Sequence, residues 1–396
     1  MLQALHKHLA RGVRERMEDS QKLSLFHKSG VYNFKDSNTV FIDPVRVLNR
    51  FYNRFTVSPS TYYPRFFKSL TPKTTVPSSP TKRKRKKRKR CSEESRPLND
   101  REQIALQRHQ ELRPLLMKAH ECLLKSNGLL GALKDLRSES DSCCLKEECE
   151  CGEQCFVELG QQAPDLVVTL NLCIRDIDKD MEDSPNVQYC EQRSILPVFN
   201  NFVVNDTEDD AMAEILNNHY IMPRESCFYM SDLGQIRNLI PAHTDCGFNL
   251  IMVDPPWENA SAHQKSRCSM SFEIPISCTC CLLQVKANGS LIGDLDLFHH
   301  RPYESLILGY SPGKVKNSDN QSKFKPLKDD HVIMSIPGDY SRKPPIADLL
   351  QEYIPGVKPP RCVELFAREI MAGCVAWGNE PLHFQDSRYF VKKMAT

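Results

Sequence analysis

The tetrapeptide Asp254-Pro255-Pro256-Trp257 combines residue types that suit the recognition of an aromatic amine. The exocyclic nitrogen of adenine is a weak nucleophile, because its lone pair is delocalised into the ring, so its modification depends on positioning. The carboxylate of Asp254 and a neighbouring backbone carbonyl can accept its two N–H groups and support the positive charge that develops during attack. Proline carries no competing N–H, and Trp257 offers a flat surface for stacking a base. The alternative is a tight turn, because Asp initiates turns and Pro-Pro holds an extended backbone.

The elements that must position this tetrapeptide are short apolar runs in the C-terminal half of the chain. Residues 248–253 form one such run and predict a strand that ends at Asp254. Further runs are ESCFYMSDL, ESLILGY, HVIMSIP and CVELFARE, with the helix-like text IADLLQEYI between two of them. Apolar strands that alternate with helices predict an α/β fold with a parallel sheet covered on both faces, whose sites form at the carboxyl ends of the strands.

Changes in composition divide the chain into four parts. We predict a small N-terminal segment at 1–68, a disordered basic linker at 69–99, a helical and strand-containing N-terminal region at 100–206 and the α/β domain at 207–396. The third part begins with apolar residues at helical spacing, which predicts a helix that Pro114 kinks and Gly128 ends. It continues with the strand-like runs DLVVTLNLCI and ILPVFNNFVV.

Several further motifs give the C-terminal half a specific resemblance. They are MSDL at 230–233, RPYESLILG at 301–309, RKPP at 342–345, ELFAR at 364–368 and WGNE at 377–380. With DPPW after an apolar strand, this set resembles the adenine-N6 methyltransferase family named for the seventy-kilodalton methyltransferase A subunit, and within it a nuclear branch. The resemblance implies a Rossmann-like domain that uses S-adenosylmethionine, and direct methyl transfer to adenine N6 without a metal.

The resemblance also implies roles for individual residues. Asp254 and Pro255 would hold the amine, Pro256 and Trp257 would shape the base pocket, and the cofactor would contact Asp232, Leu233, Lys343, Arg368, Asn379 and Glu380. Among these, Asp232 and Leu233 would contact the cofactor's adenine, Lys343 its carboxylate and the last three its ribose. Each has a structural alternative: Lys343 as a solvated turn residue, Arg368 paired with Glu364 on a helix, and Asn379 as the cap of a turn.

The interval 258–284 departs from the family pattern. In the family it holds a substrate loop, a further strand, a crossover helix and another strand, and a βαβ unit needs roughly thirty residues or more. This stretch has no helical periodicity and carries Cys268, Cys278, Cys280 and Cys281, and family-like text resumes only at Val285. We expect these cysteines to fill space, and we interpret the chain as a shortened variant whose sheet lacks a central piece. Its apolar edges would then be exposed and its activity impaired.

The chain contains 17 Cys but no apolar N-terminal run of signal-peptide type and no run long enough to span a membrane. We therefore expect reduced thiols and no disulfide framework. Cys143, Cys144, Cys149, Cys151 and Cys155 lie close together, but a second pair at zinc-site spacing does not follow them. We interpret them as a polar reduced-thiol loop and expect no metal site.

The formal net charge of +3 conceals one strongly basic run. The run consists of Lys82, Arg83, Lys84, Arg85, Lys86, Lys87, Arg88, Lys89 and Arg90. It is interpreted as a nuclear import signal, with a phosphate-binding arm as the compatible alternative. The first reading implies an import receptor as a partner and a nuclear location, with the cytosol as the alternative.

Together these features predict an S-adenosylmethionine-dependent N6-adenine methyltransferase of nucleic acid. The resemblance favours small nuclear RNA, with DNA adenine as the other candidate, because a preference for RNA depends on contacts to the ribose 2′-oxygen that no local motif reveals. Two rivals stay open: a catalytically impaired scaffold that binds nucleic acid or partners, and an N4-cytosine methyltransferase.

Overall fold

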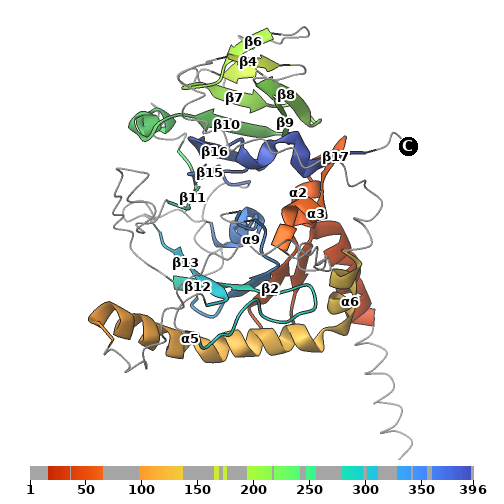
Figure 1. Cartoon of the computed structure of the whole chain (residues 1–396), viewed down its shortest axis with the longest axis vertical. Helices are drawn as coiled ribbons and strands as arrows, with labels where there is room; N and C mark the ends of the chain where they lie inside the picture. The colour runs from red at the N-terminus through yellow and green to blue at the C-terminus, as the bar shows by residue number, and fades with distance from the viewer. Residues whose placement is uncertain are drawn as a thin grey trace, which may run out of the picture.

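The computed structural model describes most of the chain in thirteen stretches. They are residues 17–35, 37–65, 98–136, 165–168, 173–175, 194–215, 218–240, 247–255, 278–297, 301–310, 328–339, 342–354 and 359–393. Two sheets form the main body, one above the other in Figure 1. The fold is α/β with mixed sheets, as predicted, although the parallel strands are divided between the two sheets. Residues 69–97 of the predicted basic linker, which contain the basic run Lys82–Arg90, and the cysteines 143–155 lie outside the described residues, whereas the last linker residue, Asn99, caps a helix.

The upper, six-stranded sheet has the order β11-β15-β16-β10-β7-β5. Its strands are β11 (Leu250–Val253), β15 (Cys362–Leu365), β16 (Cys374–Gly378), β10 (Ser226–Met230), β7 (Phe202–Asn205) and β5 (Cys173–Arg175). The first four run parallel, and β7 and β5 continue the sheet in antiparallel pairs. Three of the apolar runs predicted as strands, β11, β15 and β10, therefore have their carboxyl ends at one edge together with β16, which was not predicted as a strand. The runs ESLILGY and HVIMSIP instead form two strands of the lower sheet.

The lower, five-stranded sheet has the order β1-β2-β14-β12-β13. Its strands are β1 (Val31–Asn33), β2 (Thr39–Ile42), β14 (Val332–Ser335), β12 (Cys278–Gln284) and β13 (Tyr303–Leu308). Strand β2 pairs in parallel with β14, so residues of the predicted N-terminal segment 1–68 complete a sheet of the C-terminal half. The largest core cluster joins both, since Phe41 and Met334 are fully buried in it.

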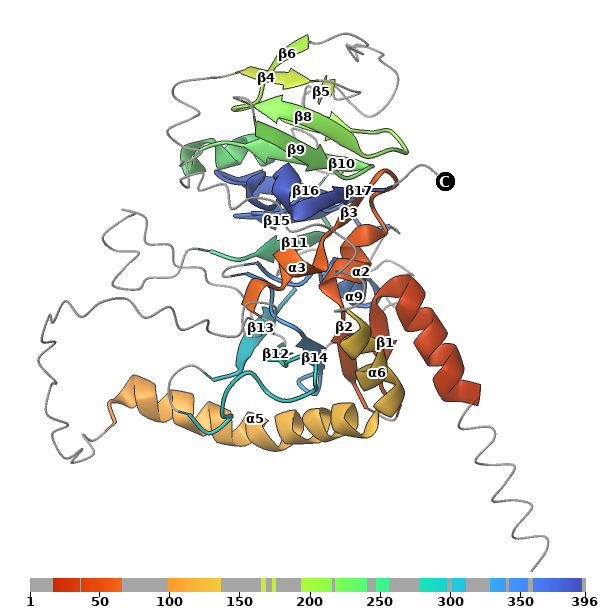
Figure 2. The ribbon, with the colours of Figure 1, turned by 45° about the vertical axis from the view of Figure 1, so that its right-hand side comes forward.

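Two smaller sheets complete the strands. The four-stranded sheet β6-β4-β8-β9 consists of β6 (Ser194–Pro197), β4 (Asp165–Val168), β8 (Ala211–Ile215) and β9 (Asn218–Met222). The predicted runs at 165–174 and 195–204 thus form strands in this sheet and in the upper one. Strand β17 (Phe390–Lys392) pairs with β3 (Phe55–Val57) beside the upper sheet, as Figure 2 shows.

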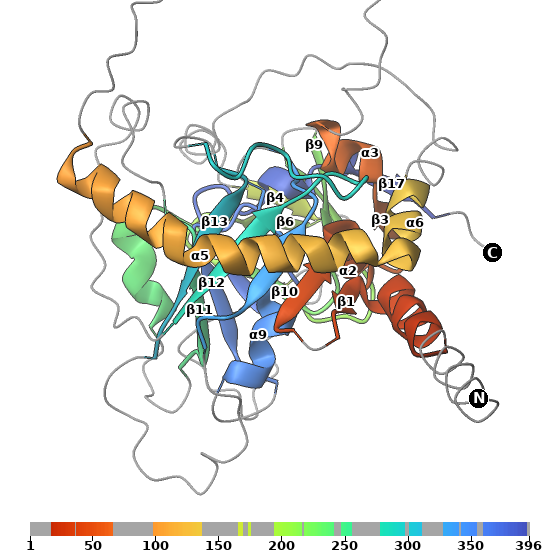
Figure 3. The ribbon, with the colours of Figure 1, turned by 90° about the horizontal axis from the view of Figure 1, so that it is seen from below.

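Two helices lie across the far side of the lower sheet, as the view from below in Figure 3 shows. Helix α5 (Asp100–Lys125) begins at a capping box, in which Asn99 and Glu102 satisfy each other's backbone N–H groups. Pro114 lies inside this continuous helix. Helix α6 (Asn127–Asp135) follows after one residue and contains Gly128, so the prediction that Gly128 ends the helix is wrong. The break falls at Ser126, whose backbone leaves helical geometry.

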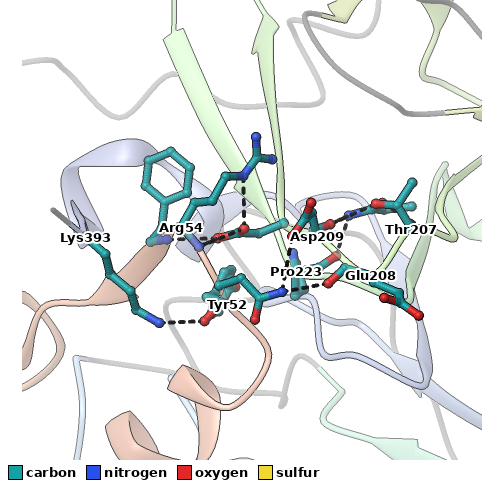
Figure 4. Close-up of polar contacts among 11 residues, drawn as sticks. Tyr52, Arg54, Thr207, Glu208, Asp209, Pro223 and Lys393 are labelled. Carbon is teal, nitrogen blue, oxygen red and sulfur yellow. Dashed lines mark hydrogen bonds and ion pairs between the residues drawn. The ribbon is translucent and has the colours of Figure 1, made fainter. Parts of the chain in front are cut away.

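A dense set of contacts, here called the N-terminal junction, joins residues 50–63 to the upper half of the molecule (Figure 4). The buried carboxylate of Asp210 accepts hydrogen bonds from the backbone N–H groups of Arg54 and Phe55, at 3.0 and 2.9 Å. The Lys393 ammonium donates to the Tyr52 carbonyl at 2.7 Å. These contacts connect segments more than 150 residues apart in the sequence.

Short helices lie directly before the junction and within it. Helix α2 (Pro44–Asn49) is capped by Asp43, and α3 (Pro59–Tyr62) places Tyr62 in the core. Helix α9 (Ala347–Leu350), predicted within IADLLQEYI, lies between the two sheets in Figure 1, and Arg50 pairs with its Asp348 at 3.0 Å. In the part of the chain that the structure describes, no helix is long and apolar enough to cross a membrane.

Candidate functional site

The predicted site residues of the upper sheet gather at the carboxyl ends of its four parallel strands. Asp254 directly follows β11, and Arg368 follows β15 after a short turn. Glu380 follows β16, and Asp232 follows β10, whose Met230 pairs with Gly378. Because the strands are parallel neighbours, these residues occupy one edge of the sheet, where ligands bind in open α/β folds.

Asp254 lies at the centre of the charged groups at this edge. Its backbone N–H donates to the Leu365 carbonyl at 3.4 Å, which anchors the residue to β15. Burial raises the pKa of Asp254, and the charge of Glu304 raises it further, whereas Lys343 and Arg368 lower it. The side chain therefore interacts with cations from both sheets. Pro255 is described and half-buried, and Pro256 and Trp257 lie outside the described residues.

Lys343 follows β14 and faces the same region from the lower sheet. Its ammonium forms an ion pair with the carboxylate of Glu304 on β13, with Nζ and Oε2 2.5 Å apart. Both residues line a cavity of about 240 Å³ at the carboxyl ends of β12 and β14. Lys343 is thus not a freely solvated turn residue, and the partner Glu304 was not predicted.

Arg368 is held by two residues beyond β16. Its guanidinium lies 3.3 Å from the Glu380 carboxylate and donates to the His383 ring nitrogen at 3.0 Å. Burial, together with the positive charges of Arg368 and Arg388, lowers the pKa of His383 to about 4, so the ring is neutral and can accept this bond. The predicted alternative, a helical pair with Glu364, is wrong because Glu364 lies on strand β15.

The remaining predicted cofactor residues differ in exposure. Asp232 and Asn379 are exposed at the sheet edge, and Leu233 is half-buried and packs against a core cluster that contains Trp377. The fully buried Trp377 donates its indole N–H to the Ser231 hydroxyl at 2.9 Å. This bond ties the end of β16 to the end of β10 and fixes the residues that follow each strand.

Behind the edge lies a second group of charged residues whose position near the site was not predicted. Glu364 lies opposite Met252 in the β11–β15 pairing, on the side of the sheet that also carries Asp254. Burial raises the pKa of Glu364 to about 8, with additional contributions from the negative charges of Glu369 and Asp254. Glu369 instead pairs with Arg342, which precedes Lys343.

Arg342 is buried and connects the site to the N-terminal junction. Its guanidinium donates through Nε to Glu369 at 3.1 Å and lies 4.0 Å from the ring centre of Tyr62 and 4.6 Å from that of Phe384. The buried atom Nη1 has no hydrogen-bond partner among the described residues. The only signal for Arg342 in the sequence was its place in the RKPP motif.

Three of the four cysteines of the interval after Trp257 lie on β12, and Cys268 lies outside the described residues. Cys278, Cys280 and Cys281 are buried, and burial raises the pKa of the Cys281 thiol to about 11. They pack as small apolar residues, which confirms that they fill space. Within the described ranges, no group of three or more His, Cys, Asp or Glu side chains is placed to hold a metal ion.

Comparisons with known proteins identify a family to which part of this chain is similar. Residues 274–380 match the MT-A70 family model. The match begins at 274, so the prediction that family-like text resumes only at Val285 is wrong, and β12 is part of the matched region. Asp254 lies before it.

Curated relatives extend the similarity beyond that match. The N(6)-adenine-specific methyltransferase METTL4 of Mus musculus is 28% identical over 364 residues, covering 77% of this chain and 71% of the relative, and that of Homo sapiens is 27% identical with the same coverage. The DNA N6-methyl methyltransferase of Caenorhabditis elegans is 26% identical over 217 residues, 44% of this chain and 57% of the relative.

The length of the alignment with the mouse relative shows that this chain lacks residues that the relative has. It runs over 364 residues but uses only about 305 of this chain's 396, so the relative has residues within the matched span that this chain lacks. The matched range 274–380 includes the edge residues Lys343, Arg368, Asn379 and Glu380, whereas Asp232 and Asp254 lie before it. Residues 274–380 therefore match the MT-A70 family, the family that the DPPW, MSDL, RKPP, ELFAR and WGNE motifs of the chain indicated.

Proposed function

We propose that the chain is an S-adenosylmethionine-dependent methyltransferase that acts on the N6 amine of adenine in nucleic acid. The observation that carries this proposal is the position of Asp254 at the carboxyl end of β11, within reach of the charges of Lys343 and Arg368. A carboxylate held there can accept an amine hydrogen while a cofactor occupies the neighbouring strand ends. The similarity to N6-adenine methyltransferases supports the same chemistry.

In this proposal Asp254 and the Pro255 carbonyl orient the amine. The two acceptors take its two N–H groups and leave the nitrogen lone pair directed away from them. S-adenosylmethionine supplies the electrophilic methyl group. The negative charge of Asp254 favours the positive charge that develops on nitrogen, and the carboxylate can accept the proton that the methylated amine releases.

The described residues fit the cofactor. The exposed Asp232 and Asn379, with Glu380 beside Arg368, present carboxylate and amide groups to one sheet edge, which suits an adenine and two ribose hydroxyls. Lys343 offers an ammonium to the cofactor carboxylate, beside a cavity of about 240 Å³. Its ion pair with Glu304 would exchange for that carboxylate on binding.

For the substrate we propose adenosine in small nuclear RNA, with DNA adenine as the alternative. The relatives support both, because they include a DNA N6-methyl methyltransferase and, in Pyricularia oryzae, an N6-methyladenosine RNA methyltransferase that is 24% identical over 269 residues, 55% of this chain and 65% of the relative. The basic run Lys82–Arg90 supports a nuclear location and an import receptor as partner.

Radiolabelled methyl transfer to a panel of small RNAs and DNA oligonucleotides, followed by nucleoside identification, tests the proposal. We expect label in N6-methyladenosine and a loss of about 100-fold or more in the Asp254→Asn variant, the usual effect of removing a group that acts in the transition state. Calorimetry should show nearly unchanged cofactor binding in this variant. Asp209→Asn, which changes an exposed carboxylate remote from the sheet edge, is the matched control. Label in N4-methylcytosine, or equal rates in parent and Asp254→Asn, would contradict the proposal.

A second candidate is a catalytically impaired scaffold, and one observation favours it. Ile251 on β11 and Ile307 on β13 are 57% and 52% exposed, as expected where a sheet lacks a strand. Cofactor binding without methyl transfer to any oligonucleotide in the panel would identify this function.

A further inference from the structure

The imidazole ring of His383 contacts Arg368, one of the residues at the carboxyl edge of the upper sheet. Nη2 of Arg368 lies 3.0 Å from Nε2 of His383 and 3.3 Å from Oε2 of Glu380. A terminal guanidinium nitrogen carries two N–H groups, so Nη2 can donate one to each of these acceptors. The ring and the carboxylate therefore hold the same end of the Arg368 side chain.

A turn after β16 brings the two acceptors together. The His383 N–H donates to the Glu380 carbonyl at 3.0 Å, which closes a turn over residues 380–383, and the short helix η5 (His383–Gln385) begins at its last residue. The next backbone N–H, that of Phe384, donates to the Arg368 carbonyl at 3.0 Å. The centre of the buried Phe384 ring lies 5.5 Å from the guanidinium carbon of Arg368. These contacts fix the position of His383 relative to Arg368.

The surroundings of His383 keep its ring neutral. Burial lowers the pKa of His383 to about 4, and the positive charges of Arg368, Arg388 and Arg342 add to this effect, whereas Asp339 opposes it. Because Nε2 faces a guanidinium, which can only donate, the single ring proton belongs on Nδ1. A protonated ring would repel Arg368 and could not accept its N–H. The neutral ring is therefore the form that this contact requires.

The exposure of Arg368 distinguishes it from a core arginine. Arg342, which contacts the same Phe384 ring, is fully buried and pairs with Glu369. The side chains of Arg368 and Glu380 are instead 31% and 27% exposed. An ion pair of this exposure holds two long side chains only weakly in one geometry, because ordering them costs entropy. A second acceptor on the same nitrogen restricts Arg368 further, and the ring of His383 supplies it.

We propose that His383 is a positioning residue that holds Arg368 and Glu380 in the arrangement that binds the two ribose hydroxyls of S-adenosylmethionine. This inference rests on the proposed function. With Nη2 engaged by the ring and the carboxylate, the pair is already ordered before the cofactor arrives. Binding then does not have to order these side chains, which increases affinity without a direct contact between His383 and the cofactor.

Calorimetric titration with S-adenosylhomocysteine and with its 2′,3′-dideoxy analogue tests the proposal, because the analogue lacks both ribose hydroxyls. His383→Phe keeps a ring but removes the acceptor. It should bind S-adenosylhomocysteine about 10-fold more weakly than the parent, the effect of losing a hydrogen bond to a charged group, and should bind the analogue within about twofold of the parent. His383→Gln, whose amide oxygen can accept the same N–H, should recover most of the lost affinity.

His27→Phe, which changes an exposed ring in the helical stretch 17–29, is the matched control and should bind both ligands like the parent. A loss of folded protein would lower the binding stoichiometry, whereas a misplaced Arg368 lowers the affinity, so calorimetry separates the two effects. Unchanged affinity in His383→Phe, equal losses for both ligands, or a His383→Gln variant as weak as His383→Phe would overturn the inference alone. A parent chain that binds neither ligand would overturn the proposed function with it.

Discussion

The two main sheets meet in two places that differ in construction. At the N-terminal junction, buried and charge-assisted hydrogen bonds connect residues 50–63 with the upper half of the molecule, and Asp210 is completely buried there. On the side of Asp254, charges of Lys343 and Glu304 from the lower sheet act on Asp254 of the upper sheet, and the Lys343–Glu304 pair is partly exposed.

This difference separates stability from ligand binding. Buried pairs at the junction cost much when one partner is removed, whereas exposed ion pairs contribute little and can exchange for a ligand. We infer that the junction holds the sheets together and that the opposite side keeps charged groups available for binding. Substitutions on the two sides should therefore affect different measurements.

The largest expected effect comes from breaking the buried pair at the junction. Arg342→Met should lower the free energy of unfolding by about 3–5 kcal/mol, because it leaves the Glu369 carboxylate without its cation and removes the contact with Tyr62. Urea unfolding measures the change. Arg50→Met breaks the exposed pair with Asp348 in the same region and should cost less than about 1 kcal/mol. Equal losses of unfolding free energy in both variants would contradict the expected difference between the buried pair and the exposed pair.

A smaller loss of unfolding free energy is expected at Asp210, which accepts hydrogen bonds from the N-terminal segment. Asp210→Ala should cost about 1.5–3 kcal/mol, because the backbone N–H groups of Arg54 and Phe55 lose a charged acceptor. Asp209→Ala, which changes the exposed neighbouring carboxylate, should cost well under half of that in the same urea titration. A stable Asp210→Ala chain would show that the junction is held mainly by apolar packing.

The strand ends were predictable from the sequence, whereas the residues that hold them were not. Short apolar runs such as the one that ends at Asp254 predict strands and the edge at which they end, because periodicity and turn residues are local signals. The contacts of Arg342 with Tyr62 and of Asp210 with Arg54 join residues far apart in the chain. Local patterns do not contain that information.

Helix boundaries and sheet membership show the same limit. Gly128 has the composition of a helix stop, but packing continues the helical path through it, since Leu129 and Leu133 are buried. The division into two sheets depends on which edges find partners. The shortened interval at 258–284 predicted only a sheet that lacks a central piece, and the sequence did not reveal that residues 39–42 complete a separate lower sheet.

The next effect concerns the pH dependence of stability near the site. In the folded chain the pKa of Glu364 is about 8, against an ordinary value of 4.5. The folded state therefore binds more protons than the unfolded state between these values, and stability should fall as pH rises through this window. Because the Glu364 side chain is half-buried, we expect the free energy of unfolding to change less over this pH window than it does in Asp210→Ala.

Thermal melts from pH 5 to pH 9 test this expectation. Glu364→Gln should flatten the decline in melting temperature and be more stable than the parent at pH 9. Glu121→Gln, on the exposed face of α5, should leave the parent's profile unchanged. A decline of the same slope in Glu364→Gln would assign the pH dependence to other groups.

The smallest effect belongs to the partly exposed pair of Lys343 and Glu304. Glu304→Gln should change the free energy of unfolding by less than about 0.5 kcal/mol, yet raise the affinity for S-adenosylmethionine about two- to fivefold, because Lys343 no longer exchanges partners. Calorimetry measures the affinity. Glu18→Gln, which breaks the exposed pair with Lys35, should leave it unchanged. Weaker cofactor binding in Glu304→Gln would instead make Glu304 a direct part of the site.

The pairing of β2 with β14 has a consequence for synthesis of the chain. Phe41 lies opposite Met334, about 290 residues later, so the lower sheet cannot be completed until most of the chain has left the ribosome. At ~5–20 residues per second this interval lasts roughly 15–60 s. During that time the β1–β2 hairpin exposes the edge that β14 later covers. We therefore expect the nascent chain to depend on chaperones most strongly before residue 335 emerges.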